Sequence, residues 1–203
     1  MSLPEPMSND DPPARTERPL RADALRNREN LVAVARAAFA VADDTVALED
    51  IAREAEVGIG TLYRHFPTRE ALVEAVYAAE LDAVTESAPL LLDQFPPDVA
   101  LAAWMKRYAE FAAAKRGIID TLRAGWASGR ITTPTTRERI TDAIDTILSA
   151  GVRTGSFRAD INPDDVTALL LGIFLSTAAK DTSAQTTRLL DLVVDSLRPQ
   201  AHR

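Results

Sequence analysis

Apolar residues recur at helical spacing along almost the whole chain from about Leu20 onward. Leu31, Ala35 and Phe39 fall at i, i+4 and i+8, so they share one face of a first helix. The sequence ADDTV at residues 42–46 then breaks this pattern. No segment shows the alternation of apolar and polar positions that is typical of a strand. The pattern therefore predicts an all-α fold.

Two short helical segments follow the break and are joined by a tight turn. The first covers about residues 48–56, and the second lies within the sequence VGIGTLYRHF at residues 57–66. Leu62 and Phe66 are four residues apart, so we expect them to anchor the second segment to the core. Two short helices braced by a third are the layout of a helix-turn-helix, whose second helix enters the major groove of DNA.

A longer helix and a connector complete the first half of the chain. Thr68 is placed to N-cap this helix, which we expect to end near Ser87. The sequence APLLLDQFPPD, which follows, is interpreted as a connector. The first 19 residues are polar and carry five prolines, which is typical of a disordered tail. The expected units are the tail (1–19), a helix-turn-helix domain (20–88) and a second helical domain (89–203).

Aromatic residues form stripes at helical spacing in the second domain. Such stripes pack into a plain core more often than they line a ligand pocket, and both interpretations stay open here. Ligand pockets are mostly apolar with a few placed polar groups, which Tyr108 and Arg123 can supply. The candidate ligand-binding residues are Trp104, Tyr108, Phe111, Leu122, Arg123 and Trp126.

A long uncharged run near the C-terminus predicts a subunit interface. Asn162 and Pro163 predict the start of a helix, and residues 166–179 then lack any charge. These 14 residues are fewer than the about 20 needed to span a bilayer. A helix that is apolar almost all round needs cover, from a second subunit or as the central helix of a monomer. The residues expected to share a dimer interface with it are Leu189, Leu190, Val193, Val194 and Leu197.

Composition excludes several classes of function. The chain has 203 residues and no cysteine, and its two histidines are far apart, so no disulfide, metal site or imidazole-based nucleophile is expected. No P-loop or Rossmann glycine pattern occurs, so we expect neither a cofactor nor enzymatic activity. The N-terminus lacks the apolar core of a secretory signal. We therefore expect a soluble cytoplasmic protein with no membrane partner.

The net charge of −7 at first disfavours a nucleic-acid partner. Residues 20–88 hold seven basic and 13 acidic residues, a net charge of −6. Only residues 15–28 are locally basic, with five arginines against two acidic residues. Any contact with DNA must therefore be local.

The sequence ALEDIAREAEVGIGTLYRHFPTREALVEAV at residues 47–76 resembles the DNA-binding domain of the TetR family of bacterial transcriptional regulators. With the preceding helix, the resemblance covers about residues 22–85. The helical remainder resembles the family's variable ligand-binding and dimerisation domain. The resemblance implies a homodimer that binds a palindromic double-stranded DNA operator and releases it when a small-molecule effector binds.

The resemblance also implies roles for individual residues. Thr61 and Tyr63 match hydroxyl contacts to phosphate, and Arg64 lies where base or phosphate contacts occur. His65 matches a family histidine, with packing at the helix end as the alternative. The positions that complete the implied DNA-binding set are Ile59, Gly60 and Arg69. Arg69 matches a phosphate-gripping position, and Ile59 favours contact with a thymine methyl group.

The sequence departs from the family pattern at the turn and on the first short helix. Glu56 stands where the family has glycine in a backbone position with positive φ, so we expect either a cost of about 1 kcal/mol or a slightly different turn. Ala47 replaces a capping Ser or Thr, and the nearby acidic residues repel phosphates if they face them. Basic residues that would compensate are Arg15, Arg18, Arg21, Arg26 and Arg28. The alternative function is a small-molecule sensor whose degenerate helix-turn-helix no longer binds DNA.

Overall fold

The structure is a computed structural model that describes residues 17–41, 46–114, 121, 135–177 and 182–199. Every regular element in this part of the chain is an α-helix, so the predicted all-α fold is confirmed. The elements are α1 (Glu17–Val41), α2 (Leu48–Glu54), α3 (Ile59–His65), α4 (Arg69–Leu92), α5 (Pro97–Ala114), α7 (Thr136–Thr154), α8 (Pro163–Ser176) and α9 (Ser183–Leu197).

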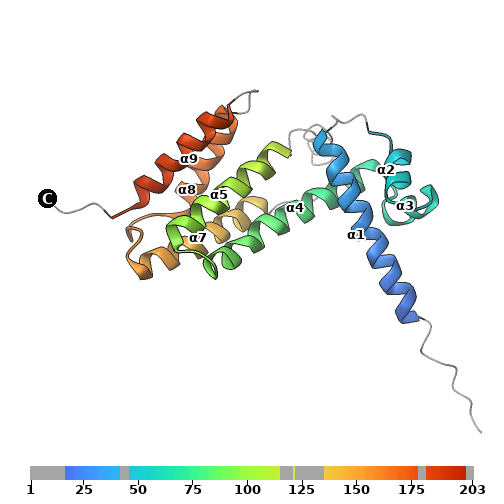
Figure 1. The fold of residues 1–203 in the computed structure, drawn as a ribbon, viewed down its shortest axis with the longest axis horizontal. Helices are drawn as coiled ribbons and strands as arrows, with labels where there is room; N and C mark the ends of the chain where they lie inside the picture. The colour runs from blue at the N-terminus through green and yellow to red at the C-terminus, as the bar shows by residue number, and fades with distance from the viewer. Residues whose placement is uncertain (1–16, 42–45, 115–120, 122–134, 178–181, 200–203) are drawn as a thin grey trace, which may run out of the picture.

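The first three helices pack together at one end of the molecule (Figure 1). The predicted face of α1 is buried, with Leu31 and Ala35 at 0% exposure. Ile51 from α2 and Leu62 from α3 join the same core. Helix α1 begins at Glu17, three residues before the expected start at Leu20. The rest of the predicted tail, residues 1–16, lies outside the described residues.

Helix α4 links this end of the molecule to the remaining helices (Figure 1). Thr68 caps it as predicted, because its side-chain oxygen accepts a hydrogen bond from the Ala71 N–H. The prediction that the helix ends near Ser87 was wrong, since α4 continues to Leu92. Ala88 and Leu91 are buried and extend its apolar face beyond the expected connector, while Pro89 lies exposed within the helix.

Helices α5, α7, α8 and α9 form the other end of the molecule (Figure 1). Helix α5 packs against α4, α7 and α9, and α8 packs against α7 and α9. Trp104, Ile144 and Leu170 are completely buried in their shared core. The α8 start is capped as predicted, since the Asn162 Oδ1 accepts a hydrogen bond from the Asp164 N–H. No described helix is both long enough and apolar enough to cross a bilayer.

Candidate nucleic-acid interface and interior aromatic cluster

The turn between α2 and α3 is a helix C-cap with one residue in the left-handed conformation. The Val57 N–H donates to the Ala52 carbonyl at 3.0 Å, and the Glu56 N–H donates to the Arg53 carbonyl at 3.1 Å. This pair of bonds is the Schellman pattern, in which glycine is preferred at the left-handed position. Glu56 occupies that position with a φ of 56°, as predicted from the family's glycine. The turn is therefore preserved with a strained residue.

We expect Glu56→Gly to stabilise the protein by about 1 kcal/mol, because glycine adopts positive φ without a Cβ clash. In a chain of this size, that gain raises Tm by about 2–4 °C. Thermal unfolding measures it. Glu56→Gln is the matched control, since it removes the same charge and retains the strain. An equal rise in both variants would assign the effect to charge instead of backbone conformation.

Helix α3 divides into a buried face and an exposed face. Leu62 is 0% exposed and Phe66, just after the helix, is 2% exposed, so both predicted anchors are confirmed. Tyr63 is 45% exposed, Ile59 is 38% exposed, and Gly60 and Arg64 are also exposed. Thr61 and His65 are partly buried. The exposed face thus presents Ile59, Gly60, Tyr63 and Arg64 on a helix that Leu62 and Phe66 anchor to the core.

Two side chains of α1 hold the helix-turn-helix in place. The Asn30 side-chain amide donates to the Ala55 carbonyl in the turn at 2.8 Å. The Arg28 guanidinium carbon lies 5.2 Å from the centroid of the Phe66 ring, within cation–π range. The sequence gives no local signal for the Asn30 contact, because the two residues are 25 positions apart. These contacts fix the orientation of α3 relative to α1.

His65 and Arg69 flank the end of α3 and contact the protein interior. The His65 ring lies 6.3 Å from the Phe66 ring, which supports the packing interpretation for this histidine. The Arg69 guanidinium lies 5.3 Å from the Phe39 ring centroid and donates to the Val46 carbonyl. Arg69 therefore joins the start of α4 to α1 and to the segment before α2, a role that sequence reasoning missed. Its phosphate contact stays a prediction.

The charges around α3 are mixed. Helix α2 starts without a side-chain cap at Ala47, and its acidic residues Glu49, Asp50 and Glu54 are exposed. Arg53 bonds Asp50 at 2.6 Å, and Arg26 pairs with Asp23 on α1. Both arginines are thus partly neutralised by neighbours on their own helices. The side chains of the other predicted compensating residues Arg15, Arg18 and Arg21 lie outside the described part of the structure.

The candidate ligand-binding stripe on α5 belongs to a larger aromatic cluster. Trp104, Tyr108 and Phe111 are buried, with ring centroids 5.4 Å apart for the first pair and 6.2 Å for the second. Tyr77 of α4 lies 5.5 Å from Phe111, and Phe174 of α8 meets Tyr108 edge-on at 5.0 Å. We call these five residues the aromatic cluster. The other candidates, Leu122, Arg123 and Trp126, lie outside the described residues.

Burial changes the acidity of both tyrosines in the aromatic cluster. It raises the pKa of Tyr108 to about 12, with a further increase from nearby Tyr77 and an opposing effect of Arg137. It also raises the pKa of Tyr77, against the lowering effect of its hydrogen bond to Thr136. Both hydroxyl groups therefore stay protonated at neutral pH. Sequence reasoning missed Tyr77 and Phe174, which come from other helices.

The first two turns of α7 are tied to α4 and α8 by polar contacts. The hydroxyl groups of Tyr77 and Thr136 are 3.0 Å apart. The Arg139 guanidinium donates to Asp82 at 2.6 Å and to Thr85 at 3.0 Å, both on α4. These bonds connect α7 directly to α4, the helix that follows the helix-turn-helix in sequence.

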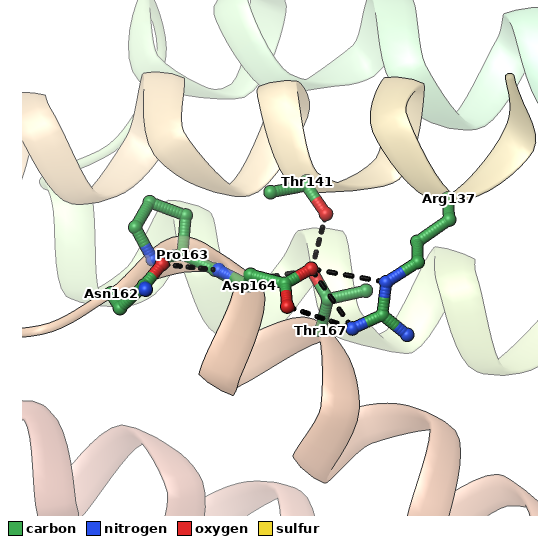
Figure 2. Close-up of polar contacts among 6 residues, drawn as sticks. All are labelled: Arg137, Thr141, Asn162, Pro163, Asp164 and Thr167. Atoms are coloured by element: carbon green, nitrogen blue, oxygen red, sulfur yellow. Dashed lines mark hydrogen bonds and ion pairs between the residues drawn. The ribbon is translucent and has the colours of Figure 1, made fainter.

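Figure 2 shows the contacts of α7 with the start of α8. Arg137 forms a two-point ion pair with Asp164, with distances of 3.0 and 2.9 Å. The hydroxyl groups of Thr141 and Thr167 are 2.9 Å apart. The α8 helix is thus held on α7 next to the aromatic cluster.

Helices α8 and α9 expose large apolar side chains away from the core. Leu175 is 78% exposed, Leu192 is 63% exposed and Leu169 is 53% exposed. Gly172, on α8, is also exposed. The prediction that most of the last helix's apolar residues face a second subunit was wrong. Within the chain itself the core buries Leu190, Val193, Val194 and Leu197, and only Leu189 is partly exposed.

These features define an all-helical protein with a helix-turn-helix, and comparisons place it in a family. The family model described as "Bacterial regulatory proteins, tetR family" matches residues 31–76. The model described as "Transcriptional regulator SbtR-like, C-terminal domain" matches residues 96–199. No curated protein matches the chain.

Solved structures agree with the family models. The TetR transcriptional regulator SCO0520 from Streptomyces coelicolor is 45% identical, with a TM-score of 0.78 over 86% of this chain and 99% of its own. A TetR regulatory protein from Mycobacterium vanbaalenii is 34% identical, with a TM-score of 0.71 over 89% of this chain and 100% of its own. RolR in complex with resorcinol shares the fold at 20% identity and a TM-score of 0.54, over 89% and 92% of the two chains.

The chain belongs to the TetR family of transcriptional regulators. It is therefore a helix-turn-helix DNA-binding regulator and not an enzyme, as the sequence indicated.

Proposed function

We propose that the protein is a ligand-responsive repressor that binds a palindromic operator as a homodimer. The observation that carries this proposal is the two-faced α3, which buries Leu62 and exposes Tyr63 and Arg64. A recognition helix needs this division, because one face must fix the helix while the other reaches base edges and phosphates. Residues 20–88 form the DNA-binding domain in this proposal, and residues 89–203 form the domain for ligand binding and dimerisation.

The proposed DNA contacts follow from exposure and chemistry. Arg64 and Ile59 face base edges, where a guanidinium recognises guanine and an apolar side chain contacts a thymine methyl group. Gly60 carries no side chain and has open space around it, so the backbone of α3 can approach the DNA closely. Thr61 and Tyr63 donate hydroxyl hydrogen bonds to phosphates, which set register without reading sequence.

Arg69 and His65, which flank the end of α3, are proposed to position the helix-turn-helix. Arg69 contacts Phe39 and Val46, so it holds the start of α4 while adding positive charge beside the phosphates. His65 packs near Phe66 and positions the end of the recognition helix. In this proposal it contacts DNA only at the edge of the interface.

The proposed dimer interface is the exposed face of α8 and α9. Leu169, Leu175 and Leu192 are large apolar side chains that are mostly exposed to water, and covering the exposed part of each one stabilises an interface. Exposed Gly172 permits close approach of a second α8. Two copies of this helix pair would make a four-helix interface with two-fold symmetry.

The proposed effector site is the aromatic cluster, which is connected to the DNA-binding end through α4. The Trp104 indole N–H donates to the Val84 carbonyl of α4 at 3.0 Å, and Tyr77 belongs to α4 itself. An effector that displaces these rings would move α4 and change the distance between the two α3 helices. RolR was solved with resorcinol bound, and a small aromatic effector agrees with the cluster's chemistry. Coupling of this kind is typically worth about 1–3 kcal/mol.

A second function is supported by the acidic surface of α2. Glu49, Asp50 and Glu54 are exposed beside the recognition helix, and Glu56 follows in the turn. If they face phosphates, they oppose DNA binding. The chain would then be a small-molecule sensor with a helix-turn-helix that no longer holds DNA.

Gel-shift titrations against duplexes selected from a random pool separate the two functions. The repressor proposal expects binding whose affinity falls steeply with salt, with a log–log slope of about −0.9 for each neutralised phosphate. The sensor alternative expects no selected sequence. Binding that stays flat between low and moderate salt would reject the proposed phosphate contacts.

A further inference from the structure

Helix α4 makes the main contact between the helix-turn-helix end of the molecule and the other helices. Among the described residues, α1 packs against α4, and α5 and α7 pack against the same helix. Figure 1 shows α4 extending from the helix-turn-helix to the C-terminal helices. The angle at which α3 is presented therefore depends on how α4 is held between α1 and α7.

Two ion pairs hold one short stretch of α4 from different sides. The Arg36 guanidinium of α1 pairs with Glu80, whose side chain is only 14% exposed. The Arg139 guanidinium of α7 pairs with Asp82 at 2.6 Å and also donates to the Thr85 hydroxyl group at 3.0 Å. Glu80 and Asp82 are two residues apart, and side chains at that spacing point in different directions from a helix. This stretch of α4 therefore connects α1 to α7 through side-chain contacts.

The Arg139 contact constrains the position of α4 more sharply than apolar packing does. Burial of apolar surface is favourable in any direction, whereas a hydrogen bond weakens steeply when its angle departs from linear. One guanidinium nitrogen of Arg139 reaches two acceptors, Asp82 and Thr85, which lie one turn apart on α4. A rotation or a slide of α4 against α7 lengthens at least one of these bonds.

The same contact contributes little to the stability of the fold. The Arg139 side chain is 36% exposed and that of Asp82 is 51% exposed. Exposed ion pairs add little to the free energy of unfolding, because water screens the two charges. A directional contact that adds little to stability and joins the two ends of the molecule is suited to setting their relative orientation.

We propose that Arg139, by bonding Asp82 and Thr85, is a positioning residue that fixes the angle between the C-terminal helices and the helix-turn-helix end. The consequence for DNA rests on the proposed function as a dimeric repressor. If each subunit holds its α3 at one angle, the distance between the two α3 helices is fixed, and operators with one half-site spacing fit best. Arg139 itself contacts no DNA in this proposal.

Distance measurements between two spin labels test the fixed angle without DNA. The chain has no cysteine, so Glu54→Cys on α2 and Ser149→Cys on α7 take labels at these two exposed positions alone. Excess unlabelled protein restricts the signal to pairs of labels within one chain. We expect double electron–electron resonance to give one narrow distance when Arg139 is present. Arg139→Ala should lose that single distance and give a broader or displaced distribution.

Arg137→Ala is the matched control, because Arg137 lies on the same helix and forms its two-point ion pair with Asp164 of α8 instead of with α4. It should retain the narrow distance. Thermal unfolding shows whether both variants fold. The inference is overturned if Arg139→Ala keeps the narrow distance, if Arg137→Ala loses it equally, or if the distribution is already broad with both arginines present.

Operator duplexes with altered half-site spacing test the consequence for DNA. One base pair added or removed between the half-sites should weaken binding of the unchanged protein. In Arg139→Ala this preference should fall by about threefold to twentyfold, because an exposed ion pair changes an equilibrium by up to about fivefold in each of the two subunits. A spacing preference that survives loss of the narrow label distance would overturn the inference.

The two proposals fail in different ways. A protein that binds no selected duplex, but whose label distance depends on Arg139 as expected, would contradict the repressor proposal and support the fixed angle. Failure of the label comparison in a protein that binds its operator normally would contradict the inference about Arg139 alone.

Discussion

Arg64→Ala should weaken operator binding by about 2–6 kcal/mol, because the proposed dimer would lose one guanidinium contact in each half-site and each loss costs about 1–3 kcal/mol. The substitution should also relax the preference for one base pair in each half-site. Arg64 is exposed on α3, so its removal leaves the core of the helix-turn-helix intact. Gel-shift titrations with the selected operator and with single-base variants of it measure both effects.

Tyr63→Ala provides the contrasting control on the same exposed face. Tyr63 is 45% exposed and is proposed to contact phosphate, so its loss should weaken all duplexes about equally. Both variants should melt within a degree or so of the unchanged protein, because surface substitutions usually change stability by less than about 0.5 kcal/mol. The role assignment is wrong if Tyr63→Ala leaves binding unchanged or if Arg64→Ala preserves base preference.

Leu175→Glu or Leu192→Glu should convert the proposed dimer to monomers. Each substitution places a charge on an apolar face, and two-fold symmetry brings two copies of that charge into one interface, which costs several kcal/mol. We expect the dimer dissociation constant to rise by about a hundredfold or more, measured by analytical ultracentrifugation. Operator binding should fall with it, since a monomer holds only one half-site.

Leu90→Glu is the matched control for the interface. Leu90 is 56% exposed on α4, comparable to Leu192 at 63%, and it lies outside the proposed α8–α9 face. It should leave the oligomeric state unchanged. Equal dissociation in all three variants, or a monomer before any substitution, would contradict the proposed interface.

Local features of the fold could be predicted from the sequence because each depends on a few adjacent residues. Leu62 and Phe66 are spaced to bury one face of α3, and the structure buries both. Thr68 and Asn162 can each cap only the helix that follows. The positive φ of Glu56 was expected from the family resemblance, because Glu56 stands where the family has glycine, and the structure shows it.

Features that depend on distant partners could not be predicted. Arg69 bonds Val46 across 23 positions, and Arg139 bonds Asp82 across 57. Residues so far apart in sequence form no periodic pattern, so the sequence alone does not indicate these contacts. Helix α9 carries apolar residues on more than one side, so periodicity alone did not show that Leu190 and Val194 face the chain's own core while Leu192 is exposed. The sequence APLLLDQFPPD favours a connector, but Ala88 and Leu91 pack into the core and α4 continues to Leu92.

We propose that two copies of the exposed α3 face read one DNA duplex with two-fold symmetry. Selection of bound duplexes from a random pool, followed by footprinting, tests it most directly. We predict an inverted repeat whose half-site centres lie about one helical turn apart, roughly 34–36 Å, with protection of both halves. Recovery of no common sequence, or of a single unrepeated half-site, would show that two α3 helices do not read one duplex together.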